Sequence, residues 1–195
     1  MREIRLKKPI WLLTAAAALA AHTALGARVD VKVEFDKAFD FRPVQTWGWN
    51  SEGPGVVRMA RTREDDPDAM HKRTMPVIVP AITAALEERG LKQATAEPDL
   101  VVTYYLLLTT NMTAQTVGQF LPATTGWGLP PFVGATQSLE MMNFGSLVID
   151  LSANKTVVWR GLAQAKIKTD ADDKRREALL REAVRDLLRR YPPRR

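Results

Sequence analysis

The sequence predicts an α+β fold, a two-layer sandwich in which two helices cover one face of a mainly antiparallel sheet. Three observations lead to this class. Residues 156–167 alternate between apolar and polar side chains and follow another strand-like run after a turn, which is typical of a hairpin. Residues 100–108 form a nearly continuous apolar run that indicates a central strand. Residues 170–190 repeat leucines and small apolar residues at helical spacing.

Two further strands are predicted near the start of the folded region. Residues 29–35 alternate valine and phenylalanine with charged residues, so they indicate a half-buried strand. Residues 44–49 predict a second, short strand with Trp47 and Trp49 on the same side. Residues 50–73 contain a Gly-Pro-Gly sequence and a mixed charge run, and we expect them to form a long exposed loop.

A helix is predicted to follow this loop. Ile78, Ile82 and Leu86 share one helical face, and Gly90 is well placed to end the helix. Because proline is tolerated in a first turn but breaks a helix interior, we expect the regular helix to begin near Pro80.

The C-terminal half supplies the best-supported local element. Residues 139–151 predict a strand, residues 152–155 a turn, and residues 156–167 the returning strand. In the returning strand Trp159 lies on the apolar face and Arg160 on the other. The helix that follows has acidic residues at its start and arginines at its end, where the helix dipole favours each charge.

Residues 1–26 have the order of a cleaved secretory signal peptide: a basic start, a short apolar run, and small residues at positions −3 and −1. We expect cleavage between Gly26 and Ala27, which leaves one domain of residues 27–195. A retained N-terminal anchor is the alternative, but the apolar run at 10–21 is shorter than the ~20 residues of a membrane span. Alanine stands where a lipoprotein carries its acylated cysteine, so we expect a non-lipidated periplasmic or secreted protein with no stable membrane anchor.

The composition excludes several classes of protein. The chain has 195 residues, of which 46% are hydrophobic and 26% charged, and these are ordinary values for one globular domain. There is no cysteine, which excludes disulfides, thiolate metal sites and a cysteine nucleophile. Without the signal the chain has 24 Lys+Arg against 21 Asp+Glu, a net charge of +3. Because this charge is small and spread out, we expect no nucleic-acid partner.

Catalytic and metal chemistry find little support in the sequence. His71 is the only histidine after the signal, and it falls in the expected loop, so a Ser-His-Asp triad or a histidine metal site is disfavoured. A calcium site in the acidic run at 64–68 is disfavoured too, because Pro67 interrupts the run. Asp40, Asp99 and Asp150 are expected at element ends, where they cap or turn the chain. We expect no enzyme, no cofactor and no metal.

Arginines recur along the predicted C-terminal helix and tail. They can form a solvated helix face or a basic stripe that binds an anionic lipid headgroup, and interleaved acidic residues favour the solvated face. The residues concerned are Arg181, Arg185, Arg189, Arg194 and Arg195.

Six short motifs in order resemble one family. They are Asp40-Phe41; Thr46-Trp47-Gly48-Trp49; Leu86, Gly90 and Leu91; Pro98-Asp99-Leu100-Val101-Val102; the hairpin pair Gly145–Leu151 and Val158-Trp159-Arg160-Gly161; and Tyr191-Pro192-Pro193. The chain thereby resembles the domain-of-unknown-function 4136 family of bacterial envelope proteins, often lipoproteins, over residues 29–193. The resemblance implies an envelope location and an α+β fold, and it implies no activity.

One segment is unusual in its lack of charge. From Leu100 to Leu139 there is no Asp, Glu, Lys or Arg, and only the first part of this stretch is a strand. Residues 109–138 therefore form a long uncharged loop that contains aromatic residues. Disorder is one interpretation, but disordered segments are rich in charge and poor in aromatics. Interface cores lack charge and carry aromatics, so we expect Phe120, Trp127 and Phe132 to form a candidate interaction surface.

Together these observations favour a non-enzymatic periplasmic or cell-envelope interaction module that uses the 109–138 loop. Its partner is expected to be another envelope protein or a second copy of the chain. The alternative is a periplasmic small-ligand or peptidoglycan-associated binding protein. A hydrolase has the least support, because no catalytic set can be recognised.

Overall fold

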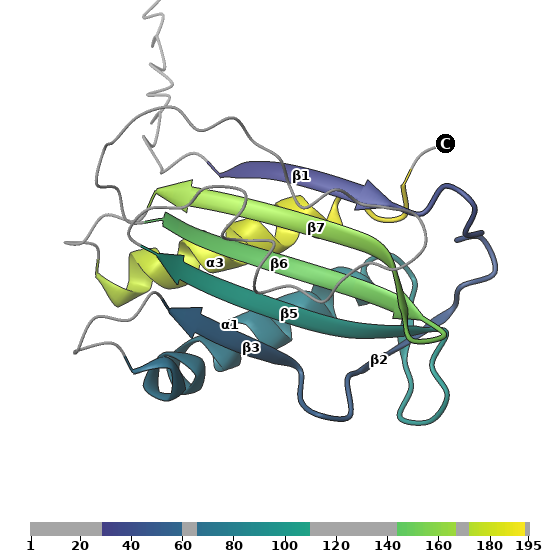
Figure 1. Cartoon of the computed structure of the whole chain (residues 1–195), viewed down its shortest axis with the longest axis horizontal. Coiled ribbons are helices and arrows are strands. Elements are labelled where there is room, and N and C mark those ends of the chain that lie inside the picture. Colours follow the sequence, from purple (N-terminus) through teal and green to yellow (C-terminus); the bar gives the residue numbers. More distant parts are fainter. Residues whose placement is uncertain (1–28, 60–65, 110–143, 167–171, 194–195) are drawn as a thin grey trace, which may run out of the picture.

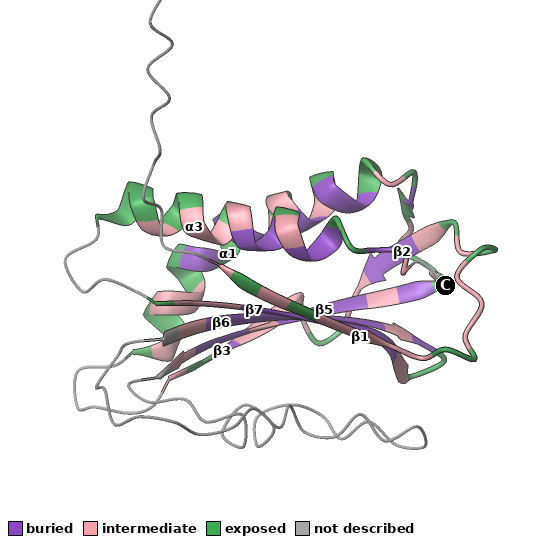
Figure 2. Cartoon of the chain, turned by 90° about the horizontal axis from the view of Figure 1, so that it is seen from above, coloured by how far each residue is buried: buried purple, intermediate pink, exposed green. Residues whose placement is uncertain are grey.

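Two helices cover one face of a seven-stranded sheet in the computed structural model of the chain (Figure 1). The structure describes residues 29–59, 66–109, 144–166 and 172–193. Both helices lie on the same side of the sheet (Figure 2), which confirms the predicted α+β fold. The strands are β1 (Asp30–Phe35), β2 (Thr46–Trp49), β3 (Gly55–Met59), β4 (Lys92–Gln93), β5 (Leu100–Thr109), β6 (Phe144–Ala153) and β7 (Thr156–Lys166), and the helices are α1 (Pro67–Glu87) and α3 (Asp173–Leu188).

The sheet is largely, but not purely, antiparallel. Its strand order is β1-β7-β6-β5-β2-β4, and β3 also pairs with β5. The pairs β1–β7, β7–β6 and β6–β5 are antiparallel, whereas β2 and β3 both run parallel to β5. The parallel pairing follows from α1, which carries the chain from β3 back to the start of β5 as a crossover connection.

The predicted C-terminal hairpin is confirmed. Strands β6 and β7 pair along their length and are joined by Asn154 and Lys155, between the paired residues Ala153 and Thr156. Both loop residues have positive φ, 49° and 65°, as a tight turn of the hairpin type requires. A register shift at Leu151/Ser152 then places Trp159 opposite Leu151.

The prediction of one long exposed loop at 50–73 is wrong. Within it, β3 pairs with β5 and buries Val57, and α1 already begins at Pro67 rather than near Pro80. The Asp66 carboxylate caps α1 by accepting hydrogen bonds from the amides of residues 68 and 69. Pro76 and Pro80 lie inside the helix on its exposed side, so the buried face of α1 continues past them.

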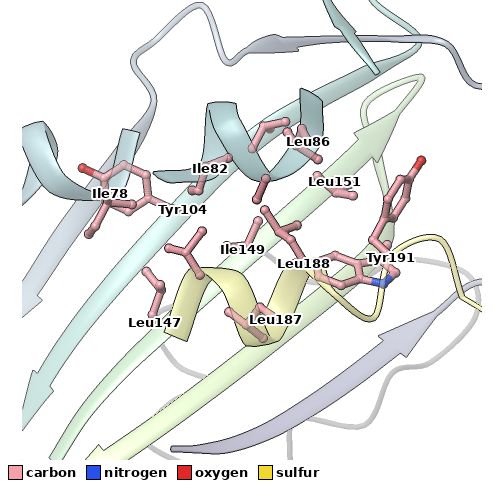
Figure 3. Close-up of a cluster of buried hydrophobic side chains, with 14 of the residues drawn as sticks. Ile78, Ile82, Leu86, Tyr104, Leu147, Ile149, Leu151, Leu187, Leu188 and Tyr191 are labelled. Carbon is pink, nitrogen blue, oxygen red and sulfur yellow. The ribbon is translucent and has the colours of Figure 1, made fainter. Parts of the chain in front are cut away.

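The core lies between the helices and the sheet. Ile78, Ile82 and Leu86 of α1 are fully buried, as are Leu187 and Leu188 of α3. Figure 3 shows these side chains pointing toward β5 and β6, where they meet four more buried side chains. Those four are Tyr104, Leu147, Ile149 and Leu151.

The two helices are also tied together where they end. Nε of Arg89, just beyond α1, donates a hydrogen bond to the carbonyl of Leu188 in the last turn of α3. Gly90 follows with a φ of 81°, a conformation that favours glycine, and this confirms its predicted place at the helix end.

Three residues from separate motifs form an aromatic cluster at one end of the core. The ring of Tyr191 lies edge-on to Phe41 and to Trp159, with centroids 5.9 and 6.0 Å apart. Gly161 leaves room for this packing, because an added Cβ would lie 2.6 Å from the Trp159 ring and 2.8 Å from Leu187. The motifs at 40–41, 158–161 and 191–193 therefore have a structural role.

Asp99 has a structural role of another kind, just before β5. Its carboxylate accepts hydrogen bonds from the Gln45 amide (2.9 Å), the Thr46 amide (2.8 Å) and the Thr46 hydroxyl (2.8 Å). These bonds hold the start of β2 against the start of β5, where Trp47 pairs with Leu100. The amide and hydroxyl donors hold the pKa of Asp99 below its usual value.

Candidate functional site

The two faces of the sheet differ in chemistry. One face carries the core and is covered by α1 and α3. Because side chains alternate along a strand, the residues between the core positions point to the opposite side, which we call the second face. Its central members are Thr103, Tyr105 and Leu107 of β5, Ser146, Val148 and Asp150 of β6, and Arg160, Leu162 and Gln164 of β7, with Lys32 and Glu34 of β1 at its edge.

The second face is buried although neither helix covers it. Leu107 and Val148 have no exposed surface, and Leu162 retains 2%. Among the residues that the structure describes, no helix or strand lies over this side of the sheet (Figure 2). Sequence reasoning placed these residues opposite the apolar face of the hairpin and did not anticipate their burial.

A row of polar side chains crosses the second face at right angles to the strands. Asp150 is the register partner of Arg160 on β7 and of Thr103 on β5, and Arg160 in turn pairs with Glu34 on β1. Beyond Thr103, the amide of Asn50 donates a hydrogen bond to the Thr103 hydroxyl at 3.3 Å. We call these five residues the polar row.

An ion pair forms the centre of the polar row. Nε and an Nη of Arg160 donate to the two carboxylate oxygens of Asp150 at 2.7 and 2.6 Å, and both side chains are more than 90% buried. Burial raises the pKa of Asp150, and the guanidinium opposes that rise. A pair held by two such bonds is matched in charge and geometry, so it fixes the β6–β7 register on this face.

Glu34 is the incompletely satisfied member of the polar row. One of its carboxylate oxygens is buried and has no hydrogen-bond partner. Burial raises the pKa of Glu34, and the charges of Arg160 and Lys32 oppose the rise. Since each unsatisfied buried acceptor costs free energy, Glu34 marks the point where the polar row can accept a further donor.

Asp150 is therefore not at an element end, where the sequence interpretation placed it. It is the seventh residue of the ten-residue β6, and its partner lies on the neighbouring strand. Asp99 and Asp40 do lie outside the strands; Asp40 pairs with Arg42 in the connection between β1 and β2. The sequence does contain an acid and an arginine on the two strands of a predicted hairpin. Only the register of the hairpin, which the sequence does not give, shows that they face each other.

The geometry gives His71 no acidic partner on the second face. His71 lies in α1 and stacks on Tyr104, with ring centroids 6.3 Å apart and an interplanar angle of 13°. Tyr104 points to the helix face, whereas Asp150 points to the other side of the sheet. The buried Tyr104 hydroxyl has no hydrogen-bond partner, and burial raises the pKa of Tyr104 to about 12.

The candidate interaction surface of Phe120, Trp127 and Phe132 lies outside the described residues, as does the cleavage site at Gly26 and Ala27. What the structure describes is where the 109–138 loop is attached. Thr109 at the end of β5 pairs with Phe144 at the start of β6, so both ends of the intervening chain meet at one point of the sheet.

The arginines of α3 and the arginine at its C-cap take part in surface ion pairs. Arg181 contacts Glu177 at 3.3 Å, and Arg185 and Arg189 contact Asp186 at 3.4 and 3.9 Å. All three arginines are well exposed, as expected for a solvated helix face. Arg194 and Arg195 lie outside the described residues.

Two features are absent from the described part of the chain. No group of three or more His, Cys, Asp or Glu side chains in it could hold a metal ion. Neither described helix combines the length and the apolar character of a membrane span.

Comparison with known families decides the relationship of the chain. The model of the family named "Domain of unknown function (DUF4136)" matches residues 31–193. The chain belongs to this family. The match spans both helices and all seven strands except Asp30, the first residue of β1, and it confirms the resemblance seen in the short motifs. No curated protein matches the chain.

Solved structures show a likeness in fold. A PDZ domain protein from Parabacteroides distasonis ATCC 8503 is 15% identical, with a TM-score of 0.51; the likeness covers 87% of this chain but only 37% of that one. This chain therefore corresponds to little more than a third of that protein. Two structures of the PelC dodecamer from Paraburkholderia phytofirmans are each 10% identical, with TM-scores of 0.41 and 0.42. They cover 83% and 86% of this chain and 95% and 100% of theirs.

Proposed function

We propose that this member of the DUF4136 family is a non-enzymatic protein of the periplasm or cell envelope that acts as an interaction module. Residues 109–138 supply its contact surface, with Phe120, Trp127 and Phe132 as the apolar anchors. The partner is another envelope protein or a second copy of the chain.

The observation that carries the proposal is the attachment of the uncharged segment. Strands β6 and β7 are joined by a two-residue turn, yet β5 and β6, which are paired just as closely, are separated by residues 110–143. A long connection between directly paired strand ends is typical of a functional loop held by a rigid scaffold. Its aromatic, uncharged composition suits the core of an interface.

The chemistry of the described residues supports a binding role over a catalytic one. The fully buried Asp150 of the second face is neutralised by Arg160, and His71 lies on the other side of the sheet. A general acid–base pair needs two titratable groups, such as a carboxylic acid and a histidine, within hydrogen-bond reach of one substrate.

The contact surface is tested by replacing Trp127 and Phe132 with serine in the full chain. We expect the envelope proteins that co-purify with the wild type to be lost, or a faster-sedimenting self-associated species to disappear, while the unfolding midpoint stays unchanged. The matched control is Met75→Ser, which removes an exposed apolar side chain from α1 and should change neither readout. Unchanged partners and sedimentation in the double variant would contradict the proposal.

The envelope location has a separate test. Intact-mass analysis of periplasmic material should find a chain that begins at Ala27, because Ala24 and Gly26 are the small residues that signal peptidase requires. A membrane-bound species that retains residues 1–26 would overturn the non-anchored location.

A thermal shift on adding peptidoglycan fragments, with no protein partner found, would favour the alternative of a ligand-binding protein.

A further inference from the structure

Strand β1 forms one edge of the sheet (Figure 1). It pairs with β7 on one side, and no described strand lies on its other side. An edge strand presents a row of backbone amides and carbonyls that can pair with a further strand. Strand β1 has six residues, whereas β4 at the opposite end of the strand order has two, so β1 offers the longer edge.

The register with β7 shows which backbone groups of β1 point outward. The amide of Asp36, just beyond β1, donates to the carbonyl of Val158 at 2.9 Å, and this bond continues the register of the two strands. In an antiparallel pair, residues that bond to the neighbouring strand alternate with residues that do not. The even-numbered residues of β1 therefore bond to β7, and the outward amides and carbonyls belong to Val31, Val33 and Phe35.

The side chains of β1 form an apolar row and a charged row on opposite faces of the sheet. The apolar row packs against the core on the helix face and consists of Val31, Val33 and Phe35. The charged row consists of Lys32 and Glu34, with Lys32 exposed. Arg160, the register partner of Glu34, forms its ion pair with Asp150, and one carboxylate oxygen of Glu34 has no hydrogen-bond partner. Lys32 and Glu34 thus offer one charge of each sign to a further strand.

A second copy of β1 matches both rows when it runs antiparallel about a two-fold axis at Val33. The outward backbone groups then face one another, because Val33 lies opposite Val33 and Val31 lies opposite Phe35 of the second copy. On the other face Lys32 of each copy lies opposite Glu34 of its neighbour, so the symmetry produces two opposite-charge pairs.

The same charges disfavour the neighbouring registers. A shift by one residue sets outward backbone groups against inward ones and exchanges the two faces. An axis at Lys32 sets lysine opposite lysine and Asp30 opposite Glu34, and an axis at Glu34 sets glutamate opposite glutamate; like charges in these positions are destabilising. In the favoured register the like pair is Asp30 with Asp36, beyond the end of the strand, where the Asp36 carboxylate accepts a hydrogen bond from the Ala38 amide.

We propose that β1 is a self-association edge, at which two copies of the chain pair their β1 strands antiparallel about Val33 and join their sheets into one. The pairing supplies about six backbone hydrogen bonds. A lysine on an edge strand normally discourages further pairing, but here Glu34 of the second copy is its partner. Since two strand edges bury little area, the dimer is weak. The contact uses none of residues 109–138, so it and the proposed contact surface can each fail without the other.

An exchange of charges tests the register in the full chain. Lys32→Glu and Glu34→Lys each set like charges opposite one another at both sites, so we expect sedimentation equilibrium to show association about tenfold weaker or more. An equimolar mixture of the two variants restores both opposite-charge pairs and should associate as the wild type does. The matched control is Lys92→Glu, the same change at an exposed position of β4, which should leave association unchanged.

A variant with both changes in one chain separates the contact from any loss of folding. Lys32→Glu/Glu34→Lys should dimerise like the wild type, which misfolding of the single variants could not produce. The same results are expected in the Trp127→Ser/Phe132→Ser background, because those changes leave β1 intact. A wild type that stays monomeric up to about 1 mM, single variants that associate as the wild type does, or a mixture that associates no better than its components would overturn the inference.

Discussion

The two faces of one sheet are stabilised in different ways. The helix face is lined by apolar side chains such as Ile149, Leu151 and Trp159, which pack against α1 and α3. The second face is buried as well, but a charged pair and a row of hydrogen-bonding side chains cross it. Apolar packing excludes a one-residue slip, because the slip would move every side chain to the other face. The Asp150–Arg160 pair adds a contact between two particular residues, so it also disfavours a two-residue slip that would keep the faces.

The family motifs lie mostly on the helix face and at its rim. Trp159, Gly161 and Tyr191 pack into the core, and Asp99 anchors β2 to β5. Membership of the family therefore accounts for the fold without indicating an activity. Arg160 is the residue of the 158–161 motif that points to the second face, where it pairs with Asp150.

The largest effect is expected on the helix face. Trp159→Ala should lower the free energy of unfolding by about 3 to 5 kcal/mol, because the ring is fully buried against Tyr191 and α3. Denaturant unfolding of the variant measures this loss. Trp49→Ala, at a half-buried position of β2, is the control and should cost less. Equal losses at the two positions would remove the distinction between core and rim.

The polar pair should behave differently from the core. Asp150→Ala leaves the Arg160 guanidinium buried without a partner, and we expect a loss of about 3 kcal/mol in unfolding free energy. The double variant Asp150→Leu/Arg160→Met removes both charges of the pair and should recover most of that loss, since neither member is left buried without the other. No core variant at Trp159 can be rescued in this way. A double variant less stable than Asp150→Ala would show that the pair stabilises the fold by more than the mutual neutralisation of its two charges.

A smaller effect is expected where the helix face is most tightly packed. Gly161→Ala should cost about 1 to 3 kcal/mol, because its Cβ meets the Trp159 ring and Leu187. Combining it with Leu187→Ala tests the contact, since the smaller side chain makes room for the added methyl group. If the two losses simply add, the close approach at Gly161 is not the cause.

The smallest effect is expected at Asp99, on the exposed rim. Asp99→Ala removes the acceptor of three hydrogen bonds and should cost about 1 kcal/mol at neutral pH. The pKa of Asp99 is lower in the folded chain than in the unfolded chain, so its contribution is fully present above the unfolded pKa. It is lost as the pH falls through the folded pKa. The stability difference between wild type and variant should therefore shrink below about pH 4, and a constant difference down to pH 2 would contradict this.

Local patterns predicted the elements whose signal is contained in one stretch of sequence. The hairpin of β6 and β7 follows from alternation and a turn, and α3 from its helical repeat. Strand β3 was missed because five residues beside a charge run look like loop, and only pairing with β5 makes them a strand. The start of α1 was misplaced because the burial of one helix face outweighs the cost of two exposed prolines.

The candidate site could be predicted only in part, for the same reason. The uncharged loop is visible in the composition of residues 109–138. The polar row draws Glu34, Asp150 and Arg160 from three strands, and no local pattern relates them. Their burial depends on the arrangement of the whole sheet.

The central claim is that the second face of the sheet is buried although neither helix covers it. Ser146→Cys places the only thiol on this face at a fully buried position, and Ser152→Cys places it on the same strand and face where the side chain is partly exposed. We expect maleimide to modify the thiol at position 146 about 100-fold more slowly than the one at 152, because reaction requires local opening. Rates within a factor of about three of each other would contradict the account.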